Sequence, residues 1–323
     1  MPDWIEPMLA TLTDRREFDD GWLLEHKFDG ERCLAFVRDA SVTLRTRTRR
    51  DVTRTYPEIA AALAGAGRLV VDGEVVAVTG EQVLGFEALQ QRLGVASPSD
   101  SLVARVPVAL CAFDLLHADG RDLTGLGVLD RKAALEDALR FGGTVRPTAH
   151  ARGESLRRYE EACTAGWEGL IAKRADAPYR QGRSRDWLKL KCLAEQELVV
   201  GGFTEPRGSR AGLGALLVGY FEDGRLRYAG KVGTGFDTRT LRDLRTHLDA
   251  LEQPHSPFAE AVRPLPAGTH WVRPVLVAQI AFAEWTRAGR LRQPRFLGLR
   301  DDKPAATVVR EQPLTPPPSS RRG

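Results

Sequence analysis

Glu25-His26-Lys27-Phe28-Asp29-Gly30-Glu31-Arg32 is the stretch that decides the fold, and it follows the apolar run Trp22-Leu23-Leu24. The apolar run predicts a strand, and the Asp-Gly step predicts a turn at its end. On such a strand Lys27 and Asp29 point to the same face, while Gly30 lets the backbone turn tightly against a ligand. The stretch therefore predicts an amine and a carboxylate presented together beside a turn.

Lysine is scarce in this chain, because 40 of its 47 cationic side chains are arginine and only seven are lysine. A lysine amine can lose its proton and attack an electrophile, whereas an arginine in practice cannot. A retained lysine therefore marks a position where an amine is needed. Such an amine must be partly deprotonated near neutral pH, which cationic neighbours or a metal ion favour. Five of the seven fall inside candidate site motifs: Lys27, Lys173, Lys189, Lys191 and Lys303.

Length and composition exclude several classes of protein. A chain of 323 residues has room for two domains and a substantial core. No apolar run approaches the roughly 18 residues of a membrane span, and residues 1–6 lack the pattern of a signal peptide. The four cysteines and six histidines are scattered, so neither a zinc site nor a disulfide scaffold is expected. We therefore expect a cytoplasmic protein, not bound to a membrane, whose cysteines serve packing or the surface.

Charge is distributed unevenly along the chain. Residues 1–192 carry 28 Lys and Arg against 29 Asp and Glu, a net charge of −1. Residues 193–323 carry 19 against 14, a net charge of +5. A basic C-terminal part suits a polyanion held mainly by a second domain, although such a charge is also ordinary for a globular domain.

The apolar pattern predicts two domains. In residues 1–192, β-rich runs joined by short turns favour antiparallel strands at 21–27, 32–38, 41–46, 69–78 and 106–116. Helical spacing predicts helices at 56–64, 86–93, 129–139 and 155–165. In residues 193–312, expected strands at 198–203, 215–221, 226–232 and 271–281 with a helix at 238–251 fit a small oligonucleotide-binding barrel. Residues 313–323 are rich in Pro, Ser and Arg, and we expect them to form a disordered tail.

Two further motifs lie in predicted strands of the first domain. Asp72-Gly73-Glu74 places two carboxylates in an apolar strand, which is costly unless they face a cleft or bind cations. A β-bulge or turn at Asp-Gly is the alternative interpretation. Phe113, which ends an apolar run before Asp114, is either a core residue or a ring that stacks on a base.

Three more motifs follow, and each also has an ordinary interpretation. Glu168 could hold a metal ion and Lys173 a phosphate, or the two could be a solvated pair. The alternation in Trp187-Leu188-Lys189-Leu190-Lys191 places both amines on one strand face, which is tolerable in water or with an anion between them. Arg300-Asp301-Asp302-Lys303 follows several arginines, and this basic cluster suits phosphates.

Taken in order and spacing, these motifs resemble the covalent nucleotidyltransferase superfamily, which comprises ATP-dependent DNA ligases, RNA ligases and mRNA capping enzymes. The resemblance spans residues 5–310 and is specific as a set, although each motif alone is weak. Segments 7–10, 179–184 and 284–292 are similar to the small bacterial ATP-dependent DNA ligases. These comprise the stand-alone C-type enzymes and the ligase module of bacterial end-joining ligases.

The resemblance implies a fold and an activity. The expected fold is α+β: an adenylation (nucleotidyltransferase, ATP-grasp-like) domain with antiparallel sheets at 1–192, then an OB-fold barrel at 193–312. The implied activity is sealing of 5′-phosphate/3′-hydroxyl nicks in duplex DNA through a lysyl-AMP and a DNA-adenylate, in bacterial DNA repair. The expected cofactors are ATP with Mg²⁺ or Mn²⁺, and the expected partner of this monomer is nicked duplex DNA. The sequence specifies neither the repair pathway nor a protein partner.

The resemblance also assigns roles around the nucleotide. Lys27 would attack the α-phosphorus of ATP, and Glu25 and Phe113 would contact and stack on the adenine. Lys189 and Lys191 would neutralise the α-phosphate. Arg32 and Glu74 would contact the ribose or the nick phosphate. Glu74 and Glu168 would help to hold a divalent metal ion.

Other roles concern DNA and the second domain. Arg300, Asp302 and Lys303 would orient the leaving pyrophosphate, which requires closure about a hinge near residue 192. Arg47, Lys173 and Arg292 would bind the nick phosphate or DNA. The family usually has Gly two residues after the arginine that corresponds to Arg47, and this chain has Arg49 there, which would alter the loop path or add a phosphate contact.

Two other functions remain open at this level. An RNA ligase or capping-type guanylyltransferase would share the first chemical step but use another acceptor, and the segment 284–292 argues against it. A non-catalytic nucleic-acid-binding protein would show erosion at Lys27, Glu168 or Lys189, and all three are intact. Because only 26 residues precede Lys27 and no four-cysteine zinc spacing is present, ATP rather than NAD is the expected cofactor.

Overall fold

A computed structural model describes residues 1–192, 194–206, 212–286 and 288–311. The predicted tail at 313–323 lies outside the described residues. The chain divides into two compact units, one formed by Met1–Cys192 and the other by Leu193–Glu311. No helix in the described part of the chain is long and apolar enough to cross a membrane.

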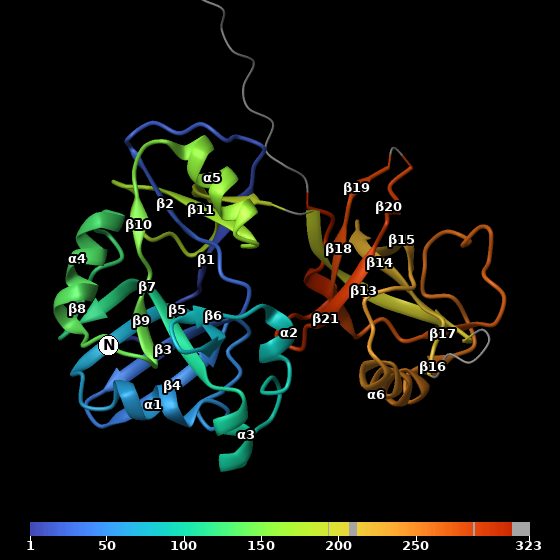
Figure 1. The fold of residues 1–323 in the computed structure, drawn as a ribbon, viewed down its shortest axis with the longest axis horizontal. Coiled ribbons are helices and arrows are strands. Elements are labelled where there is room, and N and C mark those ends of the chain that lie inside the picture. The colour runs from blue at the N-terminus through green and yellow to red at the C-terminus, as the bar shows by residue number, and fades with distance from the viewer. Residues whose placement is uncertain (193, 207–211, 287, 312–323) are drawn as a thin grey trace, which may run out of the picture. The chain divides into compact units, whose positions relative to one another are not determined.

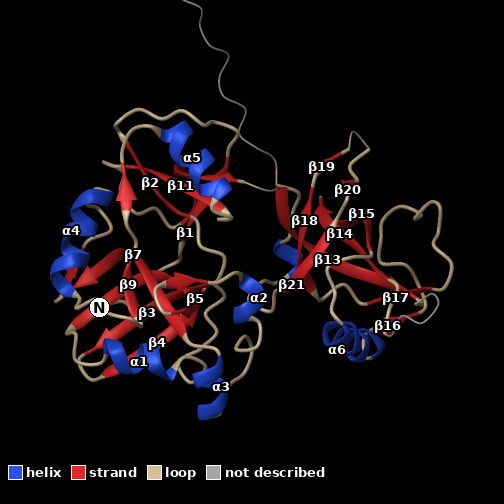
Figure 2. Ribbon diagram, in the orientation of Figure 1, coloured by secondary structure: helices blue, strands red, loops and turns tan. Residues whose placement is uncertain are grey.

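The first unit is built on two sheets (Figures 1 and 2). The five-stranded sheet has the order β1 (Met8–Leu12), β12 (Gly182–Lys191), β11 (Gly169–Arg174), β2 (Trp22–His26) and β10 (His150–Ala151). The seven-stranded sheet has the order β4 (Ser41–Thr46), β3 (Glu31–Arg38), β5 (Arg68–Thr79), β7 (Val108–Ala118) and β8 (Arg121–Asp122), with β6 (Gln82–Val83) on β5 and β9 (Val145–Pro147) on β7. Pairing is antiparallel as expected, except that β1 with β12 and β7 with β9 are parallel.

Helices cover the outer faces of these sheets. They are α1 (Pro57–Leu63), α2 (Phe86–Leu89), α3 (Asp100–Arg105), α4 (Val128–Ala138) and α5 (Ser155–Thr164). Ala162 of α5 packs with Leu24, Leu170 and Leu188 of the five-stranded sheet, and Figure 1 shows α5 beside β2 and β11. Helix α1 packs its apolar face on the seven-stranded sheet, where it contacts β4, β7 and β9.

Strand alternation therefore directs one set of side chains of each sheet inward. Between the sheets, Met8 and Trp187 of one meet Leu34, Phe36 and Phe113 of the other. Since Leu24, Leu170 and Leu188 face α5, their neighbours along each strand face this interior. The interior row of the five-stranded sheet includes most of its candidate site residues, namely Glu25, Lys27, Lys173, Lys189 and Lys191.

The second unit is a β-barrel with one helix. Its strands run in the order β15 (Arg225–Val232), β14 (Ala215–Glu222), β13 (Ala194–Thr204), β17 (Thr269–Val272) and β16 (Glu252–Gln253), and β18 (Val277–Phe282) joins β13 to β21 (Arg295–Leu299). Helix α6 (Thr238–Asp249), the hairpin β19 (Glu284–Trp285) with β20 (Leu291–Arg292) and the 3-10 turn η1 (Ala305–Thr307) complete it. One apolar core runs through the barrel, and Leu241, Leu244 and Leu248 attach α6 to it.

Most predicted elements are present within two or three residues at each end, and two differ. The run at 271–281 is two strands, β17 and β18, because Pro274 between them cannot donate to a sheet ladder. The helix expected at 86–93 is the four-residue α2, after which Gln90 to Gly94 continue as turns.

The expectation that all cysteines serve packing or the surface is wrong for two of them. Cys163 in the last turn of α5 and Cys192 directly after β12 form a disulfide with an S–S distance of 2.05 Å. Cys33 and Cys111 are buried thiols, as expected. The pair is 29 residues apart in sequence, and only the packing of α5 on the sheet brings the two together. The disulfide fastens the helix to the last residue of the first unit.

Candidate active site

Lys27 is fixed at the end of β2 by its backbone and its side chain. Its amide N–H donates to the carbonyl oxygen of Gly169 at 3.0 Å. Its ammonium forms an ion pair with Glu168, whose other carboxylate oxygen lies 3.9 Å from Lys191 Nζ. Glu168 is buried, whereas the Lys27 side chain remains 18% exposed. An accessible amine therefore lies beside a buried carboxylate and a second amine.

Strand register explains how residues far apart in sequence meet here. Strand β11 lies between β2 and β12, and Gly169 is paired with Lys191, while Ile171 is paired with Glu25 and Lys189. A Cβ at Gly169 would lie 1.8 Å from the carbonyl oxygen of Leu190, so only glycine allows this approach. The sheet thus brings Glu25, Lys189 and Lys191 onto the face that carries Lys27.

The neighbouring lysines favour the ionised form of Glu168. Burial alone would raise its pKa, but Lys27, Lys191 and Lys189 together lower the pKa below its ordinary value. His26, next to Lys27, has its pKa lowered to about 4 by burial and by the Lys27 charge. Its ring stacks on Trp167 at 3.8 Å and lies 4.3 Å from Phe28. The neighbour of Lys27 is therefore a neutral, stacked imidazole at physiological pH.

The Asp72-Gly73-Glu74 motif lies on the facing sheet, and both interpretations of it apply. A β-bulge does occur between Asp72 and Gly73, where a Cβ on Gly73 would meet Leu110 at 2.7 Å. Asp72 is fully buried and accepts two bonds of 2.6 Å from the Arg32 guanidinium, so it also binds a cation. Glu74 is paired in register with Arg32 and is half-buried.

Phe113 lies in the interior between the sheets, close to Arg32. The Arg32 guanidinium lies 4.6 Å from the centre of the Phe113 ring, and Asp72 also accepts a 2.6 Å bond from the Tyr179 hydroxyl. Gly30 lies in close contact with the backbone of β5, because a Cβ there would lie 2.1 Å from the Val75 carbonyl oxygen. The turn after Lys27 is therefore packed directly on β5.

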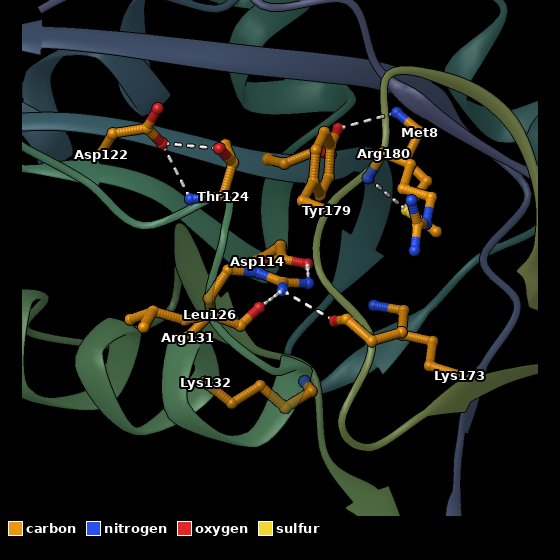
Figure 3. A network of polar contacts seen from close by, with 12 residues as sticks. Met8, Asp114, Asp122, Thr124, Leu126, Arg131, Lys132, Lys173, Tyr179 and Arg180 are labelled. Carbon is orange, nitrogen blue, oxygen red and sulfur yellow. Dashed lines mark hydrogen bonds and ion pairs between the residues drawn. The ribbon is translucent and has the colours of Figure 1, made fainter.

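Two lysines converge on Glu25. Lys132 Nζ of α4 lies 2.9 Å from one carboxylate oxygen, and Lys173 Nζ of β11 lies 2.7 Å from the other. The Lys173 ammonium is also 4.5 Å from the centre of the Phe113 ring and 4.2 Å from that of Trp187. Figure 3 shows both lysines beside the buried Arg131–Asp114 ion pair, which attaches α4 to β7.

The predicted DNA contact of Lys173 is wrong, because its side chain is only 2% exposed and faces Glu25 and two aromatic rings. Burial, opposed by Glu25 and reinforced by Lys132, lowers its pKa to about 8. Lys132 is a site residue that sequence reasoning missed. The sequence feature that could have indicated it is that Lys132 is one of only seven lysines and lies in the predicted helix at 129–139.

A pocket of about 460 Å³ opens beside Phe28. It is lined by residues from β6, β7, β9 and their loops: Glu81, Val83, Cys111, Phe141, Gly142, Gly143, Arg146 and Pro147. Arg146 closes one side by donating to the carbonyl oxygens of Gly80 and Gly143 at 2.6 and 2.8 Å. This space, adjoining the turn after Lys27, is large enough for part of a nucleotide.

Comparison with known families decides the identity. The family described as ATP dependent DNA ligase domain matches residues 7–191. The family described as ATP dependent DNA ligase C terminal region matches residues 209–303. The chain belongs to the ATP-dependent DNA ligase family.

Relatives within the ligase family cover nearly the whole chain. The multifunctional non-homologous end joining protein LigD of Pseudomonas aeruginosa is 40% identical, over 98% of this chain and 38% of its own length. DNA ligase C2 of Mycolicibacterium smegmatis is 32% identical, over 98% of this chain and 96% of its own length. The chain therefore spans about two fifths of LigD relatives and nearly all of the C2 relative.

Solved ligase structures agree with the fold. The mycobacterial DNA ligase D complexed with ATP and MES has a TM-score of 0.69 at 37% identity, covering 94% of this chain and 98% of that one. The ligase domain of M. tuberculosis LigD has a TM-score of 0.50 with the same identity and coverage. The predicted α+β class, an adenylation domain with antiparallel sheets followed by an OB-fold, is confirmed.

The candidate residues of the OB-fold lie at the end of β21 and on the hairpin. Arg300 donates to both oxygens of Asp302 at 2.8 and 2.9 Å, and the Lys303 ammonium is paired with Glu197 of β13. On the hairpin, Arg292 is exposed and lies 2.7 Å from Glu284. Each of these cations thus has a carboxylate neighbour within its own unit.

Arg49, where the ligase family usually has Gly, follows a glycine-like backbone path. Its φ of 67° lies in the left-handed region, and its amide N–H donates to Thr46 at 2.9 Å to close the turn that carries Arg47. Its guanidinium lies 5.1 Å from the centre of the Trp4 ring and 3.7 Å from Glu6. The substitution therefore keeps the turn and anchors its side chain on the N-terminal segment.

Among the residues that the structure describes, no three or more His, Cys, Asp or Glu side chains gather at a potential metal site. Mg²⁺ is commonly held by one or two carboxylates together with substrate phosphates and waters. Glu74 and Glu168 are carboxylates of the kind that Mg²⁺ takes together with a nucleotide.

Proposed function

We propose that this ligase seals 5′-phosphate/3′-hydroxyl nicks in duplex DNA through a lysyl-AMP intermediate and a DNA-adenylate. The observation that carries the proposal is the position of Lys27, an accessible amine surrounded by the buried Glu168 and by Lys191. The family is ATP-dependent, and the chain retains one amine where a covalent nucleotide bond would form.

In the first step, the Lys27 amine attacks the α-phosphorus of ATP. A nitrogen–phosphorus bond forms, the bond to the bridging oxygen of pyrophosphate breaks, and pyrophosphate leaves with the electron pair. Lys27 is paired with Glu168, so the attack requires this ion pair to separate. The ammonium gives one proton to solvent before the attack, and the nitrogen bonded to phosphorus gives up a second one afterwards. Lys189 and Lys191 neutralise the negative charge that develops on the α-phosphate.

The nucleotide base is placed in the interior beside Glu25 and Phe113. Two buried polar atoms support this proposal, because Thr148 Oγ1 and Trp187 Nε1 have no hydrogen-bond partner among the described residues. Buried polar groups of this kind are normally satisfied, so a polar ligand suits the position. Arg32 and Glu74 then face the ribose or the nick phosphate.

Glu74 and Glu168 would hold Mg²⁺ or Mn²⁺ together with the ATP phosphates. Such an ion, when bound, polarises the phosphoryl oxygens and neutralises part of their charge. Glu168 would exchange Lys27 for the ion as a partner, since one carboxylate oxygen already contacts that ammonium.

The second and third steps involve DNA. The 5′-phosphate oxygen attacks the α-phosphorus of lysyl-AMP and releases Lys27, and the 3′-hydroxyl then displaces AMP to join the strand. Arg47 and Arg292 contact the DNA phosphates in this proposal. Arg300, Asp302 and Lys303 orient the pyrophosphate in the first step, which needs the second unit to close over the first and later reopen.

The biological setting is proposed from the relatives. LigD relatives carry non-homologous end joining in their name, and the chain matches about two fifths of their length. We therefore place the enzyme in bacterial DNA repair as a cytoplasmic, monomeric ligase. A repair protein that recruits it would be found by capture on nicked or broken DNA.

Incubation with Mg²⁺ and ATP labelled at the α-phosphate tests the proposal. We expect a covalent adduct that mass spectrometry places on Lys27 and that disappears when pyrophosphate is added. Supplying nicked DNA should then transfer the label to the 5′ end and seal the strand. Absence of any adduct would favour a non-catalytic binding protein, and sealing of RNA nicks alone, or labelling by GTP alone, would favour the RNA ligase or capping alternatives.

A further inference from the structure

The ion pairs of Glu25 are unusual because one buried carboxylate is held by two lysines from different elements. Lys132 comes from α4, and its ammonium also donates to the carbonyl oxygen of Thr148 at 3.1 Å. Lys173 comes from β11 on the opposite side. All three charged side chains are at most 5% exposed. Burying three charges is costly, and this arrangement has a net positive charge.

Each lysine forms an ion pair with a different oxygen of the Glu25 carboxylate, and these two charges restrain how the group can turn. Glu25 Oε1 itself has no hydrogen-bond partner among the described residues. A carboxylate oxygen has two lone pairs, so each retains one acceptor position beyond its lysine. Lys132 donates to the backbone carbonyl oxygen of Thr148, and Lys173 lies over the Trp187 ring. The Thr148 hydroxyl and the Trp187 indole N–H are themselves buried without a hydrogen-bond partner among the described residues. Glu25 is therefore an oriented acceptor, and Thr148 and Trp187 add polar atoms that have no partner among the described residues.

Purine chemistry makes this orientation selective. An ionised carboxylate only accepts hydrogen bonds, so it suits the 6-amino group of adenine, which donates. A 6-oxo purine presents an acceptor oxygen at the same position and meets repulsion. The discrimination depends on the carboxylate staying where the two lysines hold it.

We propose that Lys132 is a specificity-determining residue, which positions Glu25 as the acceptor for the 6-amino group of ATP. This inference rests on the proposed adenylation function, and Lys132 acts through Glu25 without touching the reacting atoms. Lys173 alone would allow both carboxylate oxygens to turn toward one ammonium, away from the base. Arg131, the neighbour of Lys132, serves a different purpose because it is paired with Asp114.

The test compares adenylation by ATP, inosine triphosphate and purine riboside triphosphate, which differ only at the 6-position of the base and at N1. Wild-type protein should prefer ATP over inosine triphosphate. In Lys132→Met we expect this preference to fall by about tenfold or more, mainly through a higher KM for ATP, because a hydrogen bond to a charged group is lost. Purine riboside triphosphate, which has no 6-substituent, should respond much less.

Controls separate positioning from folding. Lys231→Met removes an exposed lysine of the second unit and should leave the preference unchanged. Lys132→Gln keeps a hydrogen-bond donor for the Thr148 carbonyl and replaces the methionine variant if that variant does not fold. It should also reduce the preference for ATP over inosine triphosphate. In a Glu25→Gln background, Lys132→Met should change the ratio no further, because its effect passes through Glu25.

Equal losses with all three nucleotides would overturn the inference, since a merely structural role lowers every rate without changing their ratio. An unchanged preference in folded Lys132→Met and Lys132→Gln would overturn it as well. These outcomes differ from a failure of the proposed function, in which wild-type protein would form no adduct with ATP at all.

Discussion

The two units treat their positive charges differently. In the first unit, several lysines share one carboxylate: Lys27, Lys189 and Lys191 act on Glu168, and Lys132 and Lys173 hold Glu25. In the second unit, each candidate cation has a carboxylate of its own, as in the pairs Arg300–Asp302, Lys303–Glu197 and Arg292–Glu284.

This difference separates a site prepared for an anion from one that must exchange partners. Several cations that converge on one buried carboxylate repel one another, and a bound phosphate would offset this repulsion. A balanced pair costs little without a ligand, but its cation must leave a carboxylate to serve a phosphate. In the proposed reaction, the first unit would therefore use binding groups that are already in place, whereas the cations of the second unit would first have to leave their carboxylates.

Lys27→Arg should have the largest effect, and it acts on the first unit. Arginine preserves the charge beside Glu168 but cannot act as a nucleophile, so self-adenylation should fall to background, at least about 10⁴-fold. The urea midpoint should stay close to that of the wild type, because the ion pair is retained. Lys27→Ala should be equally inactive and keep its fold. An adduct in the arginine variant would show that another side chain carries the nucleotide.

Cys163→Ser tests whether the first unit is also held by its covalent bond. The disulfide closes a segment of 29 residues, for which chain entropy gives a stabilisation of about 3–4 kcal/mol. We expect urea unfolding of the oxidised wild type to occur at higher denaturant than that of the variant. Dithiothreitol should bring wild-type protein to the level of the variant. Equal midpoints without reductant would show that the bond is not formed in solution.

Lys303→Ala tests the exchange expected of the second unit. Adenylation should fall about a hundredfold if this amine orients pyrophosphate, while sealing of pre-adenylated nicks should change little. Glu197→Gln, which removes the carboxylate partner, is the matched variant and should not lose adenylation. Equal losses in both steps, or in both variants, would make the pair structural.

Much of the first unit could be predicted from the sequence. Alternation in Trp187-Leu188-Lys189-Leu190-Lys191 correctly placed both lysines on one face, and the turn after Lys27 follows from its Asp-Gly step. Local patterns of this kind are set by backbone geometry over a few residues, so they can be read without tertiary contacts.

The contacts of buried lysines could not be predicted in the same way. Lys173 was expected on DNA, but β11 turns it toward Glu25, and Lys132 reaches the same carboxylate only because α4 packs beside β7. The disulfide between Cys163 and Cys192 likewise depends on α5 docking against the sheet. These ion pairs and this disulfide depend on packing between segments far apart in the chain, which the local pattern of one sequence does not specify.

Acidification should weaken the first unit through His26. Folding lowers the pKa of this imidazole from 6.5 to about 4, so the unfolded chain takes up the proton first as the pH falls. Stability from this group is present above about pH 6.5 and is lost toward pH 4. Between about pH 7.5 and pH 5, the free energy of unfolding should therefore fall less in His26→Phe than in the wild type. The difference should be roughly 1 kcal/mol after solvent screening, and urea unfolding at the two pH values measures it. His255→Phe, in the second unit, should behave as wild type.

Arg49→Gly is expected to have the smallest effect. Glycine relieves a left-handed backbone that costs roughly 1 kcal/mol, but it gives up the Trp4 contact and gains freedom in the unfolded chain, each worth about 0.5–1 kcal/mol. The net change in unfolding free energy should stay within about 1 kcal/mol. The salt dependence of the affinity for nicked DNA tells whether Arg49 contacts a DNA phosphate. A slope that falls by about one would mean that Arg49 contacts a DNA phosphate, whereas an unchanged slope would mean that it only holds the Arg47 turn against the N-terminal segment.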